Sequence, residues 1–106
     1  MLMPELNFPK IKLKSKLVNG VTQVFDIVRK DYFILTPEEW VRQHVIHYLV
    51  NYKKYPTGLM QVERLVKYNN LKTRADIIVN DRGLQPIVLV ECKASTVSIG
   101  KDAFDQ

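Results

Sequence analysis

The chain has 106 residues, of which 46% are hydrophobic and 25% charged. This composition is ordinary for one globular domain with a modest core. It excludes a membrane-spanning helix, because no apolar run approaches the required length. The net charge of +5 suits a polyanionic partner such as nucleic acid, although a solvated basic surface would give the same charge.

The cysteine content and the N-terminus predict the compartment. The only cysteine, Cys92, rules out an internal disulfide framework and fits a reducing environment. No basic segment followed by an apolar stretch, as in a signal peptide, precedes residue 10. We therefore expect a cytoplasmic protein.

A β-hairpin is predicted near the N-terminus. Residues 10–18 alternate between polar and apolar side chains, Asn19-Gly20 is a strong turn signal, and residues 21–28 return as a second strand. One face of the first strand carries four lysines, which could lie along a phosphate backbone or could protect an edge strand from aggregation. The pattern favours edge protection. These lysines are Lys10, Lys12, Lys14 and Lys16.

A helix is predicted from Pro37 to about Lys53 or Lys54. Thr36 can cap its N-terminus, Pro37 suits the first helical position, and Glu39 can complete a capping box. One stripe of the helix is apolar and should face the core. The stripe comprises Val41, Val45, Tyr48, Leu49 and Tyr52.

Further strands are predicted in the C-terminal half. Residues 74–79 and 87–93 are rich in β-branched residues, and the turn-forming segment between them makes them antiparallel neighbours. The other expected segments are a strand at 59–66, a turn at 68–70, a loop at 95–100 and a helix that begins at 101. Because the chain stops where this helix starts, we expect it to be truncated at its C-terminus.

The strands predicted at residues 74–79 and 87–93 carry acidic and basic side chains where packing alone would not place them. Asp76 lies on one strand, and Glu91 and Lys93 share a face of the next because side chains alternate along a strand. Two nearby carboxylates repel each other unless a cation lies between them, and Mg²⁺ typically uses one or two protein carboxylates. Lys93 could then orient water or neutralise phosphate. The alternative is a structural ion pair of Lys93 with either acid.

Further candidates come from the helix and from the start of residues 74–79. On a helical wheel, Glu38 lies within the apolar stripe, so we expect it to point toward the sheet and supply another acid. Glu39 lies off the stripe and is its substitute. Both could simply favour the positive end of the helix dipole. Arg42 and Arg74 could contact DNA phosphates or pair with the site acids.

Two histidines, the cysteine and a further acid have less specific patterns. His44 and His47 are predicted to be surface residues rather than metal ligands, since no third ligand is near them in the sequence. Cys92 should be a small buried hydrophobe on the face opposite Glu91. Glu63, on the expected strand at 59–66, could approach the site.

The chain resembles the N-terminal nuclease domain of the R subunit of type I restriction enzymes, a branch of the PD-(D/E)xK superfamily. The resemblance implies an α/β, restriction-endonuclease-like mixed β-sheet flanked by helices. Residues 1–30 would be a β-hairpin extension and residues 31–106 a partial nuclease-like core. The supporting segments are residues 35–43, 74–77 and 90–94.

The resemblance also implies a function: cleavage of double-stranded DNA with Mg²⁺ or Mn²⁺, in a complex with other restriction-modification subunits. By carry-over, Asp76 and Glu91 are the metal ligands and Lys93 completes the motif. Glu38 (or Glu39) is the acid of the first helix, and Gln106 stands where the family has a helical glutamine. A departure is Ala75, in place of the motif's proline. The alternative function is a catalytically inactive DNA-binding or assembly module with a nuclease-like fold.

Overall fold

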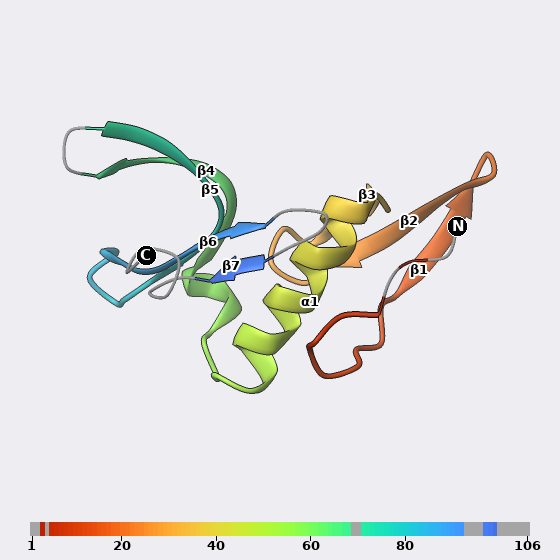
Figure 1. Cartoon of the computed structure of the whole chain (residues 1–106), viewed down its shortest axis with the longest axis horizontal. Helices are drawn as coiled ribbons and strands as arrows, with labels where there is room; N and C mark the ends of the chain where they lie inside the picture. Colours follow the sequence, from red (N-terminus) through yellow and green to blue (C-terminus); the bar gives the residue numbers. More distant parts are fainter. Residues whose placement is uncertain (1–2, 4, 69–70, 93–96, 100–106) are drawn as a thin grey trace.

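The structure, a computed structural model, describes residues 3, 5–68, 71–92 and 97–99 and forms two antiparallel sheets and one α-helix (Figure 1). In chain order the elements are β1 (Ser15–Val18), β2 (Val21–Asp26), β3 (Asp31–Ile34), α1 (Pro37–Asn51), the short 3₁₀ helix η1 (Thr57–Leu59), β4 (Met60–Tyr68), β5 (Leu71–Asn80), β6 (Pro86–Cys92) and β7 (Val97–Ile99). None of the described helices is long and apolar enough to cross a membrane.

The first sheet has the order β1-β2-β3 and contains the predicted hairpin. Asn19 and Gly20 both have positive φ angles, 50° and 78°, as a two-residue hairpin turn requires. The Asp26 carboxylate accepts the backbone N–H groups of Val28 and Arg29, which turns the chain there. The turn ends β2 earlier than predicted and leaves the residues before Lys14 without strand partners. After the turn the chain forms β3, which pairs antiparallel with β2 and was not predicted from the sequence.

Helix α1 begins as predicted and ends at Asn51. The Thr36 hydroxyl accepts the Glu39 N–H at 3.0 Å, and a proline occupies the first turn. Tyr52, expected at the end of the apolar stripe, is exposed because the helix stops before it.

The second sheet has the order β4-β5-β6-β7. The pairing of β5 with β6 confirms the predicted antiparallel neighbours. The expectation of a loop at 95–100 was wrong in part, because Val97–Ile99 pairs with β6 as an edge strand. The expectation of a mixed sheet also fails for the described residues, in which every strand pair is antiparallel and one α-helix is present. The expected helix from residue 101 lies outside the described residues.

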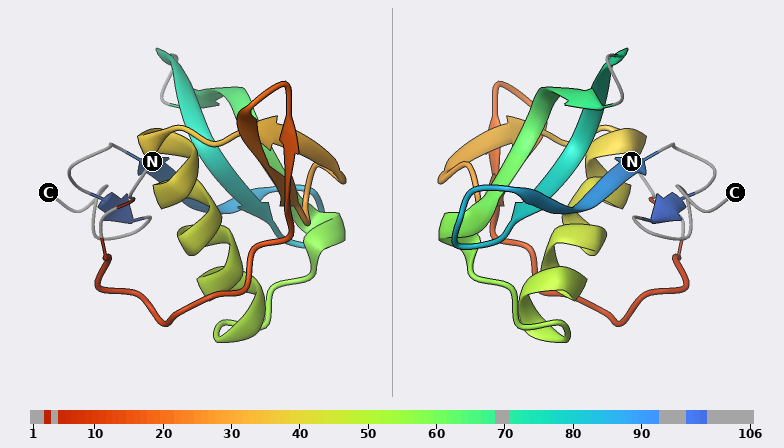
Figure 2. Two further views of the ribbon diagram at one scale, coloured as in Figure 1. Left: turned by 90° about the vertical axis from the view of Figure 1, so that its right-hand side faces the viewer. Right: turned by 90° about the vertical axis from the view of Figure 1, so that its left-hand side faces the viewer.

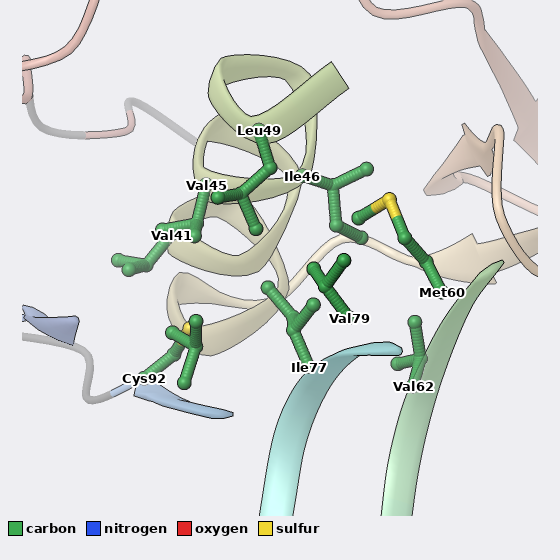
Figure 3. Packing of buried hydrophobic residues seen from close by; sticks show 10 residues of the cluster. Val41, Val45, Ile46, Leu49, Met60, Val62, Ile77, Val79 and Cys92 are labelled. Atoms are coloured by element: carbon green, nitrogen blue, oxygen red, sulfur yellow. The ribbon is translucent and has the colours of Figure 1, made fainter. Parts of the chain in front are cut away.

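The core lies between α1 and one face of the second sheet (Figures 2 and 3). Val41, Val45, Ile46 and Leu49 come from the helix. They pack against strand residues that are also buried. These are Met60, Val62, Ile77, Val79, Val90 and Cys92. This packing fixes the start of α1 beside β5 and β6, where the candidate acids lie.

Candidate functional site

Asp76 lies just beyond the point where the backbone ladder between β5 and β6 stops, at Ile77 and Val90. Its Oδ2 accepts the backbone N–H of Cys92 at 2.7 Å, so the carboxylate replaces a missing ladder acceptor. Its Oδ1 accepts Arg42 Nη2 at 3.3 Å. These contacts hold the C-terminal end of β6, which carries Glu91, beside β5.

A pocket of about 330 Å³ opens at this place. Its lining brings together three carboxylates and one guanidinium from α1, β5 and β6. The lining residues are Glu38, Arg74, Asp76, Glu91 and Cys92. Four sequence-predicted site residues therefore share one pocket, whereas Lys93 and Gln106 lie outside the described residues.

The orientations expected for the two helix acids were wrong. The Glu38 side chain is 53% exposed and that of Glu39 only 6%. Glu38 still lines the pocket, but from its rim. The helical wheel failed because it assumed that an inward face must be apolar. In the first turn of α1 the inward face is filled by charged groups that contact Glu39.

Glu39 is the centre of a buried polar network that joins the first sheet to the helix. Its carboxylate accepts Arg42 Nη1 at 2.7 Å, Arg29 Nη2 at 2.8 Å and Gln43 Nε2 at 2.9 Å. Arg29 and Gln43 are in turn bound by Asp26 Oδ2, at 2.8 and 2.9 Å. An unbroken chain of hydrogen bonds thus leads from Asp26 through Glu39 and Arg42 to Asp76, and it crosses the domain boundary expected at residue 30.

Asp26, which is fully buried, is held as a carboxylate. Burial alone would raise its pKa, but hydrogen bonds from Arg29 and Val28 and the charge of Arg29 outweigh burial and lower the pKa below the ordinary 3.8. The sequence signal for this residue was a lone acid between Phe25 and Ile27 at a strand end. That signal could not identify its partners.

Asp26 predicts a pH dependence of stability. A carboxyl with a lowered pKa stabilises the fold above pH 3.8, and the stabilisation is lost as the pH falls through the folded-state pKa. Asp26→Asn should therefore lower the free energy of unfolding by about 1.5–3 kcal/mol at pH 7 and by less at pH 3. Denaturant titrations across this range test it, with the exposed Glu5→Gln as control. A difference that does not change with pH would contradict it.

Arg42 is paired with the site acids, one of its two predicted roles; the other was contact with a DNA phosphate. It is 4% exposed and contacts Glu38, Glu39 and Asp76 at 2.9, 2.7 and 3.3 Å. Burial would lower its pKa, but the charges of Glu39, Glu63 and Asp76 raise it overall. The DNA contact that was the other role predicted for Arg42 stays a prediction, since these acids occupy its guanidinium in the structure. Arg74 is 62% exposed and pairs with Glu63, so it can still meet a phosphate.

Glu63 lies on β4 in a strained conformation, with φ at 54°. Its neighbours Val62 and Arg64 pair with Ile77 and Ala75, so Glu63 stands across from Asp76 where the ladder is interrupted. Its carboxylate contacts Arg29 at 3.3 Å and also Arg74. Its position relative to the site could not be derived from the strand pattern alone.

The histidines expected on the surface are more enclosed than predicted. His44 is buried, with Nδ1 2.9 Å from the Trp40 carbonyl oxygen and its ring against Trp40. The segment that contains Leu6 and Phe8 lines the same side of the helix. Burial and the nearby His44 lower the pKa of His47. Cys92 is buried as predicted, and burial followed by the charge of Asp76 raises its pKa to about 12.

The pocket suits a cation that needs few protein ligands. Among the described residues no three carboxylate, imidazole or thiol groups are close enough to form a ready-made metal site. Mg²⁺ needs only one or two carboxylates, since water and phosphate oxygens complete its shell. Each oxygen of Asp76 accepts one hydrogen bond, from Arg42 or from the Cys92 N–H, and can accept a further contact. Two carboxylates that line the pocket, those of Asp76 and Glu91, are thus of the ligand type and number that Mg²⁺ uses.

Fold and site together define an α/β domain with an acidic pocket where a helix N-terminus meets two antiparallel strands. The chain belongs to the family described as type I restriction enzyme R protein N terminus (HSDR_N), whose model matches residues 37–106. The match includes every residue of the pocket. It excludes Asp26 and Arg29. No curated protein and no solved structure shows a significant match to the chain.

Proposed function

We propose that the chain is the nuclease domain of a type I restriction R protein and cleaves phosphodiester bonds of double-stranded DNA with Mg²⁺. One observation carries the proposal: Asp76 from β5, Glu91 from β6 and Glu38 from α1 line a single pocket. Family membership supports a role in restriction. The more specific assignment to the PD-(D/E)xK superfamily belongs to the proposal.

In this proposal Asp76 and Glu91 hold the metal. When bound, the ion would withdraw charge from the scissile phosphate and lower the pKa of attacking water. Hydrolysis would join the oxygen of a water molecule to phosphorus as that water gives up a proton to solvent, and would break the bond from phosphorus to one ester oxygen, which takes up a proton. Lys93, two residues after Glu91, would neutralise phosphate charge, and Arg74 at the pocket would bind a neighbouring phosphate.

Arg42 and Glu39 have a positioning role in this scheme. Arg42 binds Asp76 with one terminal nitrogen and Glu39 with the other, so the network fixes where the Asp76 carboxylate points. The guanidinium also offsets the negative charge that would otherwise gather at the pocket. Neither residue needs to touch DNA.

The alternative is a DNA-binding or assembly module without catalysis. It is favoured by the pairing of Asp76 with Arg42, which neutralises the acid without a metal, and by the absence of a three-ligand cluster among the described residues.

Metal binding distinguishes the two proposals. Calorimetric titration with Mg²⁺ or Mn²⁺ should show binding to the wild-type chain. The Asp76→Asn, Glu91→Gln double variant should lose it. The control variant Asp31→Asn, which changes an exposed acid outside the pocket, should bind like wild type. A folded wild-type chain that binds neither ion would favour the module without catalysis.

A further inference from the structure

The outer face of the first sheet carries a set of basic and aromatic side chains that the pocket does not use. Strand register places Lys16, Gln23 and Ile34 in one row across the three strands and Phe25 beside Tyr32 in the next. Lys14 pairs with Phe25 through the backbone, at 2.8 Å between its carbonyl oxygen and the Phe25 nitrogen. We call this surface the lysine–aromatic face; it consists of Lys14, Lys16, Gln23, Phe25, Tyr32 and Ile34.

The lysines are held over the aromatic rings. Lys16 Nζ lies 4.1 Å from the centre of the Tyr32 ring, and Lys14 Nζ lies 5.6 Å from that of Phe25. The two rings meet edge to face at 5.3 Å. Cation–π contact of this kind positions the ammonium groups while leaving them exposed.

The acidic side chains of this sheet lie on its other face, where the guanidinium of Arg29 also lies over the Phe33 ring. Asp26 and Asp31 are the acids of these strands. They stand opposite each other in the strand register, on the face that also carries Val24 and Phe33. Asp26 is turned into the buried network there. The lysine–aromatic face has no acid among its residues, and its Ile34 is 55% exposed.

Protection of an edge explains only part of this arrangement. β1 is an edge strand, as predicted, and lysines on it would discourage pairing with other chains. Edge protection does not require two aromatic rings beneath the ammonium groups, nor a row that continues across β2 to β3. In Figure 1 the hairpin of β1 and β2 extends to one end of the long axis, away from the hairpin of β4 and β5. Lys14 and Lys16 on this hairpin are exposed.

We propose that the lysine–aromatic face binds the phosphate backbone of duplex DNA. Charge indicates a phosphate ligand: lysines bind phosphate as point charges, and none of the six residues of this face is an acid that would oppose them. Because a lysine lies over each ring, we expect phosphate contact and no sequence preference, rather than stacking on bases. The inference rests on the proposed function for the choice of DNA as partner, but the binding requires neither the metal nor the pocket.

The test measures DNA binding in EDTA, so that cleavage cannot contribute. Anisotropy of a short fluorescent duplex is followed over about 50–200 mM salt for wild type and for the Lys14→Gln, Lys16→Gln variant. The slope of log K against log salt is negative, and each lost phosphate contact should reduce its magnitude by about 0.9, so two should reduce it by about 1.8. The matched control is Lys53→Gln, Lys54→Gln, which removes the same charge from exposed residues after α1 and also has a lysine near a ring, that of Tyr48.

Equal losses from the two lysine pairs would overturn the proposal, because net charge alone would then explain binding. A preference for single strands that Tyr32→Ala abolishes would also overturn it in favour of base stacking. Binding through the face by a chain that neither binds metal nor cleaves would contradict the proposed function and leave this inference intact. If the Lys14→Gln, Lys16→Gln variant bound DNA as tightly as wild type and still cleaved it in Mg²⁺, this inference would be wrong and the proposed function would stand.

Discussion

Replacing Arg42 with methionine should lower the free energy of unfolding by about 3–5 kcal/mol. The substitution keeps an unbranched apolar side chain but removes the guanidinium that lies between Glu39 and Asp76. Glu39 would remain buried with fewer partners. A carboxylate left in that position loses more than the pair contributed, because its desolvation is no longer compensated.

Two variants make the Arg42 prediction specific. Arg74→Met removes an arginine that pairs with Glu63 but is largely exposed, and it should cost about 0–1 kcal/mol. Glu39→Gln combined with Arg42→Met should destabilise less than the sum of the single changes, since the double variant leaves no buried carboxylate at position 39. Denaturant unfolding measures all three free energies. An Arg42→Met variant as mild as Arg74→Met would show that the network contributes little.

Replacing Asp76 with asparagine should reduce DNA cleavage by a factor on the order of 10²–10³, as loss of one charge-stabilising group typically does. The amide oxygen can still accept the Cys92 N–H, so the end of β6 should keep its position. The variant lacks the negative charge that the proposed metal requires. Initial rates of plasmid cleavage give the effect, with circular dichroism to confirm folding.

The matched control for Asp76→Asn is Glu5→Gln, which neutralises an exposed acid outside the acidic pocket. Its cleavage rate should equal that of wild type. If Asp76→Asn retained the wild-type rate while folded, Asp76 would not be a metal ligand in the reaction.

Local signals were sufficient for much of the fold. Asn19-Gly20 predicted the first hairpin because few residues accept two successive positive φ angles. Thr36 and Pro37 predicted where α1 begins, because capping depends on adjacent residues. The antiparallel pairing of β5 with β6 followed from the short connection, and that pairing brought Asp76 and Glu91 to one pocket.

The polar network could not be predicted in the same way. Asp26 and Gln43 are 17 residues apart, and Arg42 and Asp76 are 34 apart. Nothing local indicates which charged residues will meet. The hydrophobic pattern predicted that Glu38 points inward and Glu39 does not. The reverse holds, because three polar partners stabilise Glu39 in a buried position. Strand β3 was missed for a related reason: the turn after Asp26 depends on its side-chain hydrogen bonds.

The network also connects the two parts of the chain that were predicted to be separate domains, residues 1–30 and 31–106. Asp26 and Arg29 precede the segment matched by the family model, yet they bind Glu39 and Gln43 on α1. The N-terminal sheet is therefore bonded to the helix that supplies Glu38 and Arg42 to the site. Removal of the first 30 residues would leave Glu39 without its Arg29 contact.

The central claim is that the acidic pocket cleaves DNA with a divalent metal. The most direct measurement is conversion of supercoiled plasmid by the wild-type chain, in Mg²⁺ and in EDTA, beside Asp76→Asn in Mg²⁺. We predict nicked or linear plasmid for the wild-type chain in Mg²⁺, and little or none in EDTA or with Asp76→Asn. Cleavage that persists in EDTA, or intact plasmid with a folded wild-type chain that has bound Mg²⁺, would contradict the claim.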